Sequence, residues 1–395
     1  MEDTSVDSGE LKATLRRLIE AKSSLQAVRE HAEAGGGTDR ALWAELAELG
    51  WLGLLVPEAY GGLGLGLAEA GILYEELGRS LSRVPVLPAL LAVQAIADAG
   101  DAEQKARWLP AITTGELAAG FALPDLTPAG AVSRIGADGV VDGVVPHVLF
   151  ADSADLLFVP VVDAQGARHL AALAPGEAGV SVERRPAIDL TRDLCTVSLD
   201  GAVVPADRLL SLDAAQWSAL FDHAAVALAC DAVGGALHIL ERTAEYMRTR
   251  VQFDRPIGSF QALKHRAATW KIQQEAATAL ARHAISLVGE RAPGSSAAAS
   301  AAKFYAGDVY AAIAGDAVQL HGGIGFTWEH ECHLFLKRAK LGQVLFGSST
   351  GHKERVAELL FAAPAASGAQ PVHKAGDGCE ALGAASAPVN ADAVL

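Results

Sequence analysis

The chain of 395 residues is long enough for two or three domains, or for one large helix-rich domain. Apolar residues make up 51% and charged residues 20%, as in globular proteins, and the formal net charge of −15 argues against non-specific binding to nucleic acid. The four cysteines show no Cys-x-x-Cys pairing and no apolar run reaches membrane-spanning length, so we expect a reduced cytoplasmic protein without a membrane span.

Apolar side chains at helical spacing predict that the first part of the chain is helical. A run of three glycines follows the first helix, and a glycine-rich loop covers residues 50–64. The predicted helices span residues 9–33, 43–49, 67–79, 86–99 and 102–113. Because their Leu and Ala faces can bury one another, we expect a helical domain over residues 1–117.

The spacing of apolar residues changes from about Ala118. Short β-rich runs, separated by turn residues, cover residues 140–145, 156–162, 169–173 and 195–199. They predict a β domain over residues 118–213, set between two helical parts. Helical spacing then returns and predicts a C-terminal helical domain over residues 214–363, whereas the Ala- and Gly-rich tail over residues 364–395 is expected to be disordered. The predicted fold class is α+β.

The strongest functional signal comes from two stretches that lie far apart in sequence. The first is Arg250-Val-Gln-Phe-Asp-Arg-Pro-Ile-Gly-Ser-Phe-Gln261, which follows an apolar helical run and contains the helix-stopping Pro256. The second is Gln319-Leu-His-Gly-Gly-Ile-Gly-Phe-Thr-Trp-Glu-His330, in which we expect Thr327 to cap the next helix. Both stretches therefore lie at predicted helix boundaries.

Both stretches suit a cofactor that carries phosphate. The guanidinium of Arg250 offers a planar fork of donors that fits a pyrophosphate. The glycines at positions 322, 323 and 325 allow a close approach of the backbone, and the Gln261 and Gln319 side chains can hydrogen-bond a ribose or an amide edge. The alternative is that the glycines only end a helix and that Arg250 forms a surface ion pair.

Together the two stretches resemble the C-terminal domain of the acyl-CoA dehydrogenase family. That family shows Arg-x-Gln-Phe-Gly-x-Pro-Ile-x-x-Phe-Gln and Gln-x-x-Gly-Gly-x-Gly segments at this separation, and the likeness extends over roughly residues 10–362. It implies an N-terminal helical domain, a central β-barrel-like domain and a C-terminal four-helix bundle. One departure is Asp254, which replaces the family's glycine after Phe253.

The resemblance also implies FAD as the cofactor, much of it contacted across a subunit boundary. The residues implied to contact FAD are Arg250, Gln252, Phe253, Gln261, Gln319, Gly322, Gly323, Gly325 and Ser348. In the family reaction a base removes the proton α to a thioester while a hydride leaves the β carbon for the flavin. An electron-transfer flavoprotein or a similar acceptor is the implied electron partner.

The usual catalytic base of the family is missing from this sequence. The position of its glutamate is occupied by Phe346, which cannot take up a proton, and a second family position for the base corresponds to Ala224. Asp222 and His223 lie nearby and could act as a relocated base. The alternative is that an acidic residue at such a helix start caps the helix or complements its dipole.

The predicted β domain departs from the family pattern as well. Leu123 replaces a threonine that hydrogen-bonds the flavin ring in the family, and His147, expected to be a loop residue, replaces a tryptophan. Three histidines and Cys332 lie close in sequence between positions 321 and 333, but they overlap the glycine motif, so we expect no metal site. The basic cluster of Lys337, Arg338 and Lys340 is expected to be solvated, unless it meets coenzyme A phosphates.

These departures leave three functional hypotheses. The leading one is a subunit for FAD-linked α,β-dehydrogenation of an acyl-CoA thioester, lacking the base, in a hetero-oligomer with another acyl-CoA dehydrogenase-like chain. The second is a homo-oligomeric dehydrogenase with a relocated base at Asp222 or His223. The third is a non-redox protein of the same fold that binds acyl-CoA without oxidising it.

Overall fold

The computed structural model describes residues 8–35, 37–122 and 133–361. Its N-terminal part is helical, and the six helices described there are α1 (Ser8–Lys22), α2 (Leu25–Glu33), α3 (Arg40–Glu48), α4 (Leu67–Ser80), α5 (Val86–Ala99) and α6 (Ala102–Thr113). The prediction of a single helix over residues 9–33 is wrong, because the helix is interrupted at Ser23 and Ser24. The Ser24 hydroxyl accepts a hydrogen bond from the Ala27 N–H and starts α2 as its N-cap.

The central part forms one sheet with its own apolar core. Its strands are β1 (Ala119–Phe121), β2 (Ser133–Ile135), β3 (Val140–Leu149), β4 (Leu156–Val162), β5 (Arg168–Leu173), β6 (Val180–Arg185), β7 (Leu194–Val203) and β8 (Leu209–Ser211). The order is β6-β7-β3-β1-β4-β5-β8, and β2 pairs with β3 and β4. Strands β1 and β2 run parallel to β4, whereas the other pairs are antiparallel. Alternating valines such as Val159, Val161 and Val197 fill the core.

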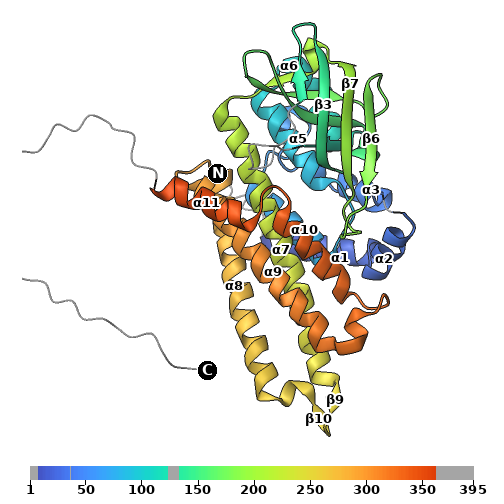
Figure 1. The fold of residues 1–395 in the computed structure, drawn as a ribbon, viewed down its shortest axis with the longest axis vertical. Helices are drawn as coiled ribbons and strands as arrows, with labels where there is room; N and C mark the ends of the chain where they lie inside the picture. Colours follow the sequence, from blue (N-terminus) through green and yellow to red (C-terminus); the bar gives the residue numbers. More distant parts are fainter. Residues whose placement is uncertain (1–7, 36, 123–132, 362–395) are drawn as a thin grey trace, which may run out of the picture. The chain divides into compact units, whose positions relative to one another are not determined.

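The C-terminal part is helical again. It contains α7 (Ala214–Thr249), a hairpin of β9 (Val251–Gln252) and β10 (Arg255–Pro256), α8 (Gln261–Gly289), α9 (Ser295–His321), α10 (Cys332–Val344) and α11 (Ser349–Phe361). Helix α7 packs against α8, α9 and α10 and also against α4 and α5 (Figure 1). The predicted order of helical, β and helical parts is therefore present among the described residues, and the predicted disordered tail lies outside them.

Glycines set the close packing of α4 on α7. A Cβ added at Gly234 would lie 1.9 Å from the Glu75 carbonyl oxygen, and one added at Gly78 would lie 2.1 Å from the Asp231 carbonyl oxygen. Only glycine therefore permits this separation of the two helices. The contact holds the N-terminal helices against the C-terminal bundle.

Helix α7 is the one described helix that is long and apolar enough to cross a membrane by length and composition alone. Its most apolar window is 89% buried inside the protein. That burial is expected of a core helix, since the apolar side chains already contact α4, α5, α8 and α9.

Candidate functional site

Both sequence motifs lie at the same end of the C-terminal helices. Helix α7 ends before Arg250, the β9–β10 hairpin turns the chain back, and α9 ends at His321, so both stretches lie toward the end of α7 that points away from the sheet (Figure 1). The Tyr246 ring stacks on the His321 ring with centroids 4.3 Å apart. We call residues 250–261 and 319–330 the bundle tip.

The hairpin of the bundle tip turns on two residues with positive φ. Phe253 has φ 54° and Asp254 has φ 62°, where glycine and asparagine are usual. The Phe253 side chain is 85% exposed and meets the Phe260 ring edge-on at 6.1 Å. Asp254, the departure from the family glycine, therefore lies at a strained position of an exposed turn.

The three glycines of the second motif have different roles. Gly322 ends α9 with φ 63°, and a Cβ at Gly322 or Gly323 would meet nothing within 4 Å. A Cβ at Gly325 would instead lie 2.8 Å from the Val318 carbonyl oxygen. Gly322 and Gly323 therefore leave the backbone open to a ligand, whereas Gly325 permits the turn to pack against α9.

The polar side chains of the bundle tip are available to a ligand. Arg250, Gln252, Gln261 and Gln319 are all exposed, and none of their side chains has a hydrogen-bond partner among the described residues. Next to them lies a hollow of about 230 Å³ lined by residues of α7 and of the second motif: Arg242, Glu245, Tyr246, Thr249, His321 and His330. A free guanidinium, free amides and open glycine backbone fit the diphosphate and ribose groups of FAD.

Ser348 is not brought to the bundle tip. It lies beyond the other end of α10, where its hydroxyl accepts a hydrogen bond from the Gly351 N–H at 3.1 Å and helps to start α11. Helix α10 has 13 residues, which corresponds to a length of roughly 20 Å. Ser348 therefore cannot share a single contact region with Gly323.

At the position where the sequence resemblance predicts that the family base is replaced, the structure has a buried, apolar side chain. Phe346 is 4% exposed and has φ 53°. Its carbonyl oxygen accepts a hydrogen bond from His352 Nε2 at 3.1 Å, and Lys303 Nζ donates to the Gln343 and Gly347 carbonyl oxygens on either side. Bonds to backbone hold this segment in place, and Phe346 itself supplies no group that can accept a proton.

Asp222 is engaged by two neighbours. It is 3% exposed, its Oδ1 accepts from Arg355 Nη1 at 2.7 Å, and its Oδ2 accepts from the Ser296 hydroxyl. The helix begins at Ala214 with Asp213 as its N-cap, so Asp222 lies inside α7 and does not cap it. Its contacts are those of a buried ion pair that ties α7 to α9 and α11.

His223 is fully buried with both ring nitrogens bonded. Nδ1 lies 2.7 Å from Gln94 Oε1, so it carries the proton and donates, and Nε2 accepts from the Tyr74 hydroxyl at 2.8 Å. Burial lowers the pKa of His223 to about 3. A group of this basicity is poorly matched to removing a carbon-bound proton near neutral pH.

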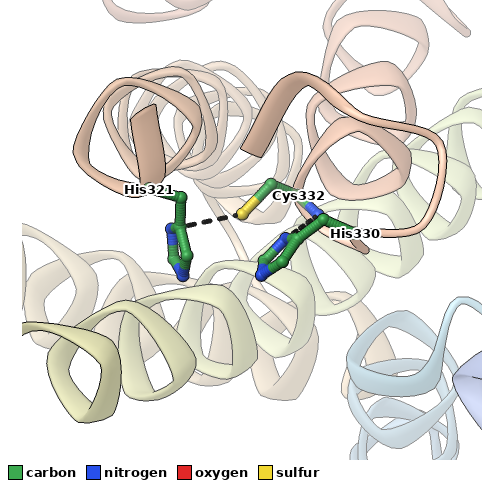
Figure 2. Close-up of side chains that lie close together, drawn as sticks. All are labelled: His321, His330 and Cys332. Atoms are coloured by element: carbon green, nitrogen blue, oxygen red, sulfur yellow. Dashed lines mark hydrogen bonds between the residues drawn. The ribbon is translucent and has the colours of Figure 1, made fainter. Parts of the chain in front are cut away.

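His321, His330 and Cys332 come together beside the glycine motif (Figure 2). Their possible ligand atoms lie within 4.8 Å of one another, and the His321 and His330 rings are 4.5 Å apart between centroids. His321 Nδ1 donates to the Ala317 carbonyl oxygen at 2.8 Å, and His330 Nδ1 accepts from the Cys332 N–H at 3.2 Å. His330 Nε2 therefore carries a proton, and His321 Nε2 is the imidazole nitrogen left with a free lone pair.

The surroundings of the Cys332 thiol favour its neutral, protonated form. Burial, and then the charge of Glu331, raise the pKa of Cys332 to about 12. Metal ligation would require the thiolate and a rearranged His330. The described hydrogen bonds therefore account for the cluster as a packed group that joins α9 to α10.

One sequence prediction at the bundle tip is wrong. Thr327 does not cap α10, because its hydroxyl donates to the Ile324 carbonyl oxygen and α10 begins only at Cys332. A tight turn therefore uses the residue that the pattern assigned to the start of the helix.

Leu123, predicted to replace a flavin-contacting threonine, lies outside the described residues. His147 lies within β3, not in a loop as predicted, and it is exposed with φ 60°. The pairing of β3 with β7 shifts between Val145 and Val148, so His147 occupies a β-bulge.

A buried ion cluster that the sequence did not predict lies at the meeting point of the three parts. Arg338, expected to be solvated, is 4% exposed and donates through Nε at 3.2 Å and through Nη2 to the carboxylate of Asp231. Arg192 contacts the same carboxylate at 3.0 Å. Asp231 in the middle of an apolar helix was the available signal, because a buried carboxylate needs a partner.

Known proteins share this architecture. Residues 6–116 match the acyl-CoA dehydrogenase N-terminal domain and residues 213–361 match its C-terminal domain. Acyl-CoA dehydrogenase IpdE2 of Mycolicibacterium smegmatis is 32% identical over 352 residues, which cover 89% of this chain and 98% of that protein.

Two solved structures are similar over most of the chain. The ChsE4–ChsE5 complex from Mycobacterium tuberculosis has a TM-score of 0.85 at 28% identity, covering 92% of this chain and 100% of that one. The Tcur3481–Tcur3483 steroid ACAD has a TM-score of 0.82 at 30% identity, covering 90% of this chain and 97% of that one.

Proposed function

The chain belongs to the acyl-CoA dehydrogenase family, whose cofactor is FAD, and we propose that it is the base-lacking subunit of a hetero-oligomeric acyl-CoA dehydrogenase. The observation that carries the proposal is Phe346, a buried phenylalanine held by backbone hydrogen bonds at the position of the family's base. A competent partner chain would supply the carboxylate.

The contacts of the two relocated-base candidates support this assignment over a self-sufficient enzyme. Asp222 is paired with Arg355 and Ser296, and His223 uses both ring nitrogens on Tyr74 and Gln94. Catalysis by either residue would require these buried contacts to break.

The bundle tip would serve a flavin held mainly by the partner. FAD, when bound, accepts the hydride that leaves the β carbon of the acyl group. Arg250 would pair with the diphosphate, Gln261 and Gln319 would hydrogen-bond its polar groups, and Gly322 and Gly323 would let the backbone approach. Ser348 would contribute only at a separate flavin site, since it lies at the far end of α10.

Exposed apolar side chains around the bundle tip support association with another chain. Phe253 is 85% exposed, Phe326 83% and Trp328 58%. Such clustering on one end of a chain is typical of an interface. Two similar solved structures are each named for two proteins, ChsE4–ChsE5 and Tcur3481–Tcur3483, which also favours a hetero-oligomer. An electron-transfer flavoprotein or a similar carrier would then reoxidise the flavin.

The cysteines favour the cytoplasm as its location. Cys195, Cys230 and Cys332 are free and buried, as expected in a reducing compartment.

The decisive experiment compares the chain purified alone with the chain co-expressed with a homologue that retains the glutamate. We expect no acyl-CoA-dependent flavin bleaching from the chain alone, and bleaching from the co-purified assembly. A yellow homo-oligomer that oxidises acyl-CoA by itself would refute the proposal. A colourless chain that binds acyl-CoA and captures no homologue would support the non-redox binding hypothesis instead.

Phe346→Glu sharpens this experiment. It restores the family carboxylate in a chain whose β domain still lacks the family's flavin contacts, so we expect no activity from the isolated variant. The matched control is Phe346→Gln, because glutamine is close in shape to glutamate but has no carboxylate. Flavin bleaching by the isolated Phe346→Glu variant, and not by Phe346→Gln, would show that the chain holds its own functional flavin site.

A further inference from the structure

A small cavity lies where the three parts of the chain meet. Its walls come from α4 and α5, from the end of β3, and from α7 and α10. Apolar side chains such as Leu77, Val84, Leu149 and Leu228 form most of the lining. Its volume is about 40 Å³, which is enough for one or two water molecules or for the end of a larger ligand, but not for a whole acyl group.

One wall of this cavity is charged. Arg192, Asp231 and Arg338 line it with exposed fractions of 6%, 8% and 4%. The Asp231 carboxylate is shared by the two guanidinium groups. Asp189 is buried near them and supplies the second negative charge, while its Oδ1 accepts hydrogen bonds from Thr191. The two positive and two negative charges therefore balance.

Arg192 has a donor that this cluster does not use. Its Nη1 is buried and has no hydrogen-bond partner among the residues that the structure describes. Arg338, in contrast, directs its Nη1 to the Thr191 hydroxyl at 2.9 Å. The Oδ2 atom of Asp189 in the same cluster is also buried and unpaired among the described residues. A buried, unpaired N–H of a charged group is costly, and a ligand or an ordered water in the adjacent cavity would satisfy it.

We propose that this cavity binds the end of an acyl group that carries a neutral oxygen acceptor, such as a ketone, and that Arg192 selects it. The apolar walls fit the hydrocarbon around the oxygen, and Arg192 Nη1 donates to the oxygen itself. A ketone is favoured over a carboxylate because the charges around Asp231 are already balanced, and a further buried anion would be uncompensated.

The inference rests on the proposed function only in taking an acyl-CoA as the ligand. It concerns binding by this chain's own cavity, and it does not require the chain to oxidise what it binds. The flavin colour of the co-expressed assembly tests the proposed function, whereas ligand affinity tests this inference, so either idea can fail without the other.

The test is titration calorimetry of the full-length chain with three CoA thioesters. Heptanoyl-CoA has no oxygen on its acyl chain beyond the thioester, 6-oxoheptanoyl-CoA carries a ketone at carbon 6, and adipoyl-CoA carries a carboxylate at the same carbon. We expect the oxo ligand to bind on the order of tenfold more tightly than heptanoyl-CoA, and adipoyl-CoA to bind more weakly than the oxo ligand. Equal affinities for the first two, tightest binding of adipoyl-CoA, or no binding of any of the three would overturn the proposal.

Two variants locate the selectivity. Arg192→Lys keeps a positive charge beside Asp231 but removes the Nη1 donor. The ratio of the affinity for 6-oxoheptanoyl-CoA to that for heptanoyl-CoA should therefore fall to about one. Leu228→Ala alters the apolar wall and should change both affinities while leaving their ratio within about twofold. An unchanged ratio in a folded Arg192→Lys protein would remove Arg192 from the site. Should that variant fail to fold, the affinity ratio of the unmodified chain decides the question.

Discussion

Replacing Asp231 by Asn tests the buried cluster that joins the three parts of the chain. The substitution preserves shape but removes the only carboxylate that contacts both Arg192 and Arg338 among the described residues. Two buried guanidinium groups would then lose the carboxylate that they share, and of the charges in this cluster only Asp189 would remain to offset them. Breaking a buried ion pair by removing one partner costs about 3–5 kcal/mol.

The expected cost converts to a measurable melting shift. An unfolding entropy of roughly 2.1 cal/mol/K per residue gives ~0.8 kcal/mol/K for a cooperative chain of 395 residues. Asp231→Asn should therefore lower Tm by about 4–6 °C in calorimetry at pH 7. The matched control is Asp207→Asn, which breaks a pair with Arg107 whose side chains are 49% and 45% exposed. Such a surface pair contributes less than about 1 kcal/mol, so its Tm should change by roughly 1 °C or less.

The drop in Tm caused by Asp231→Asn should also depend on pH. Burial alone would raise the pKa of Asp231, but the charges of Arg192 and Arg338 outweigh burial and hold that pKa below its usual value. The stabilisation is therefore complete above the unfolded pKa of about 4 and is lost as the pH falls through the folded pKa. A Tm shift at pH 7 no larger than that of the control would refute the account of the cluster.

Four further predictions concern the site and the assembly. Arg250→Ala should reduce FAD content after gel filtration of the assembled protein, because a charge-assisted contact of about 1.5–3 kcal/mol is lost; unchanged content excludes Arg250 from the site. Phe346→Ala should leave activity of the assembly nearly intact but cost roughly 3–5 kcal/mol of stability through the cavity, measured by chemical denaturation. Light scattering should show a dimer or tetramer with the partner, and a monomer under all conditions would contradict the interface. His223→Gln should flatten the acid loss of stability: burial lowers the pKa of His223 to about 3, so between pH 6.5 and 3 only the unfolded chain takes up this proton, at about 1.4 kcal/mol per pH unit.

Local patterns predicted the elements better than their ends. The helical and alternating periods identified the three parts of the chain, since each period reflects one buried face. The break at Ser24 and the late start of α10 were missed because a side-chain cap and a 3₁₀ turn compete with helix continuation over only two or three residues.

That each motif lies at the end of a helix could be predicted from sequence, because the residues that end the helix lie within or next to the motif. The cluster around Asp231 could not, because its partner Arg338 lies 107 residues away and only packing of α7 on α10 brings them together. Likewise, the bonds of His223 to Tyr74 and Gln94 cross between the N-terminal and C-terminal helices. A pattern read along the chain contains no information about such pairings.

The exposed aromatic side chains of the bundle tip have a consequence for how the cell must produce this protein. In the proposed hetero-oligomer, a chain released without its partner presents Phe253, Phe326 and Trp328 to water at one end, and such a surface favours self-aggregation and recognition by chaperones and proteases. Surplus copies would be removed, so the steady amount of this chain would follow that of its partner. Matched synthesis of the two chains is therefore expected to matter as much for yield as the stability of either fold.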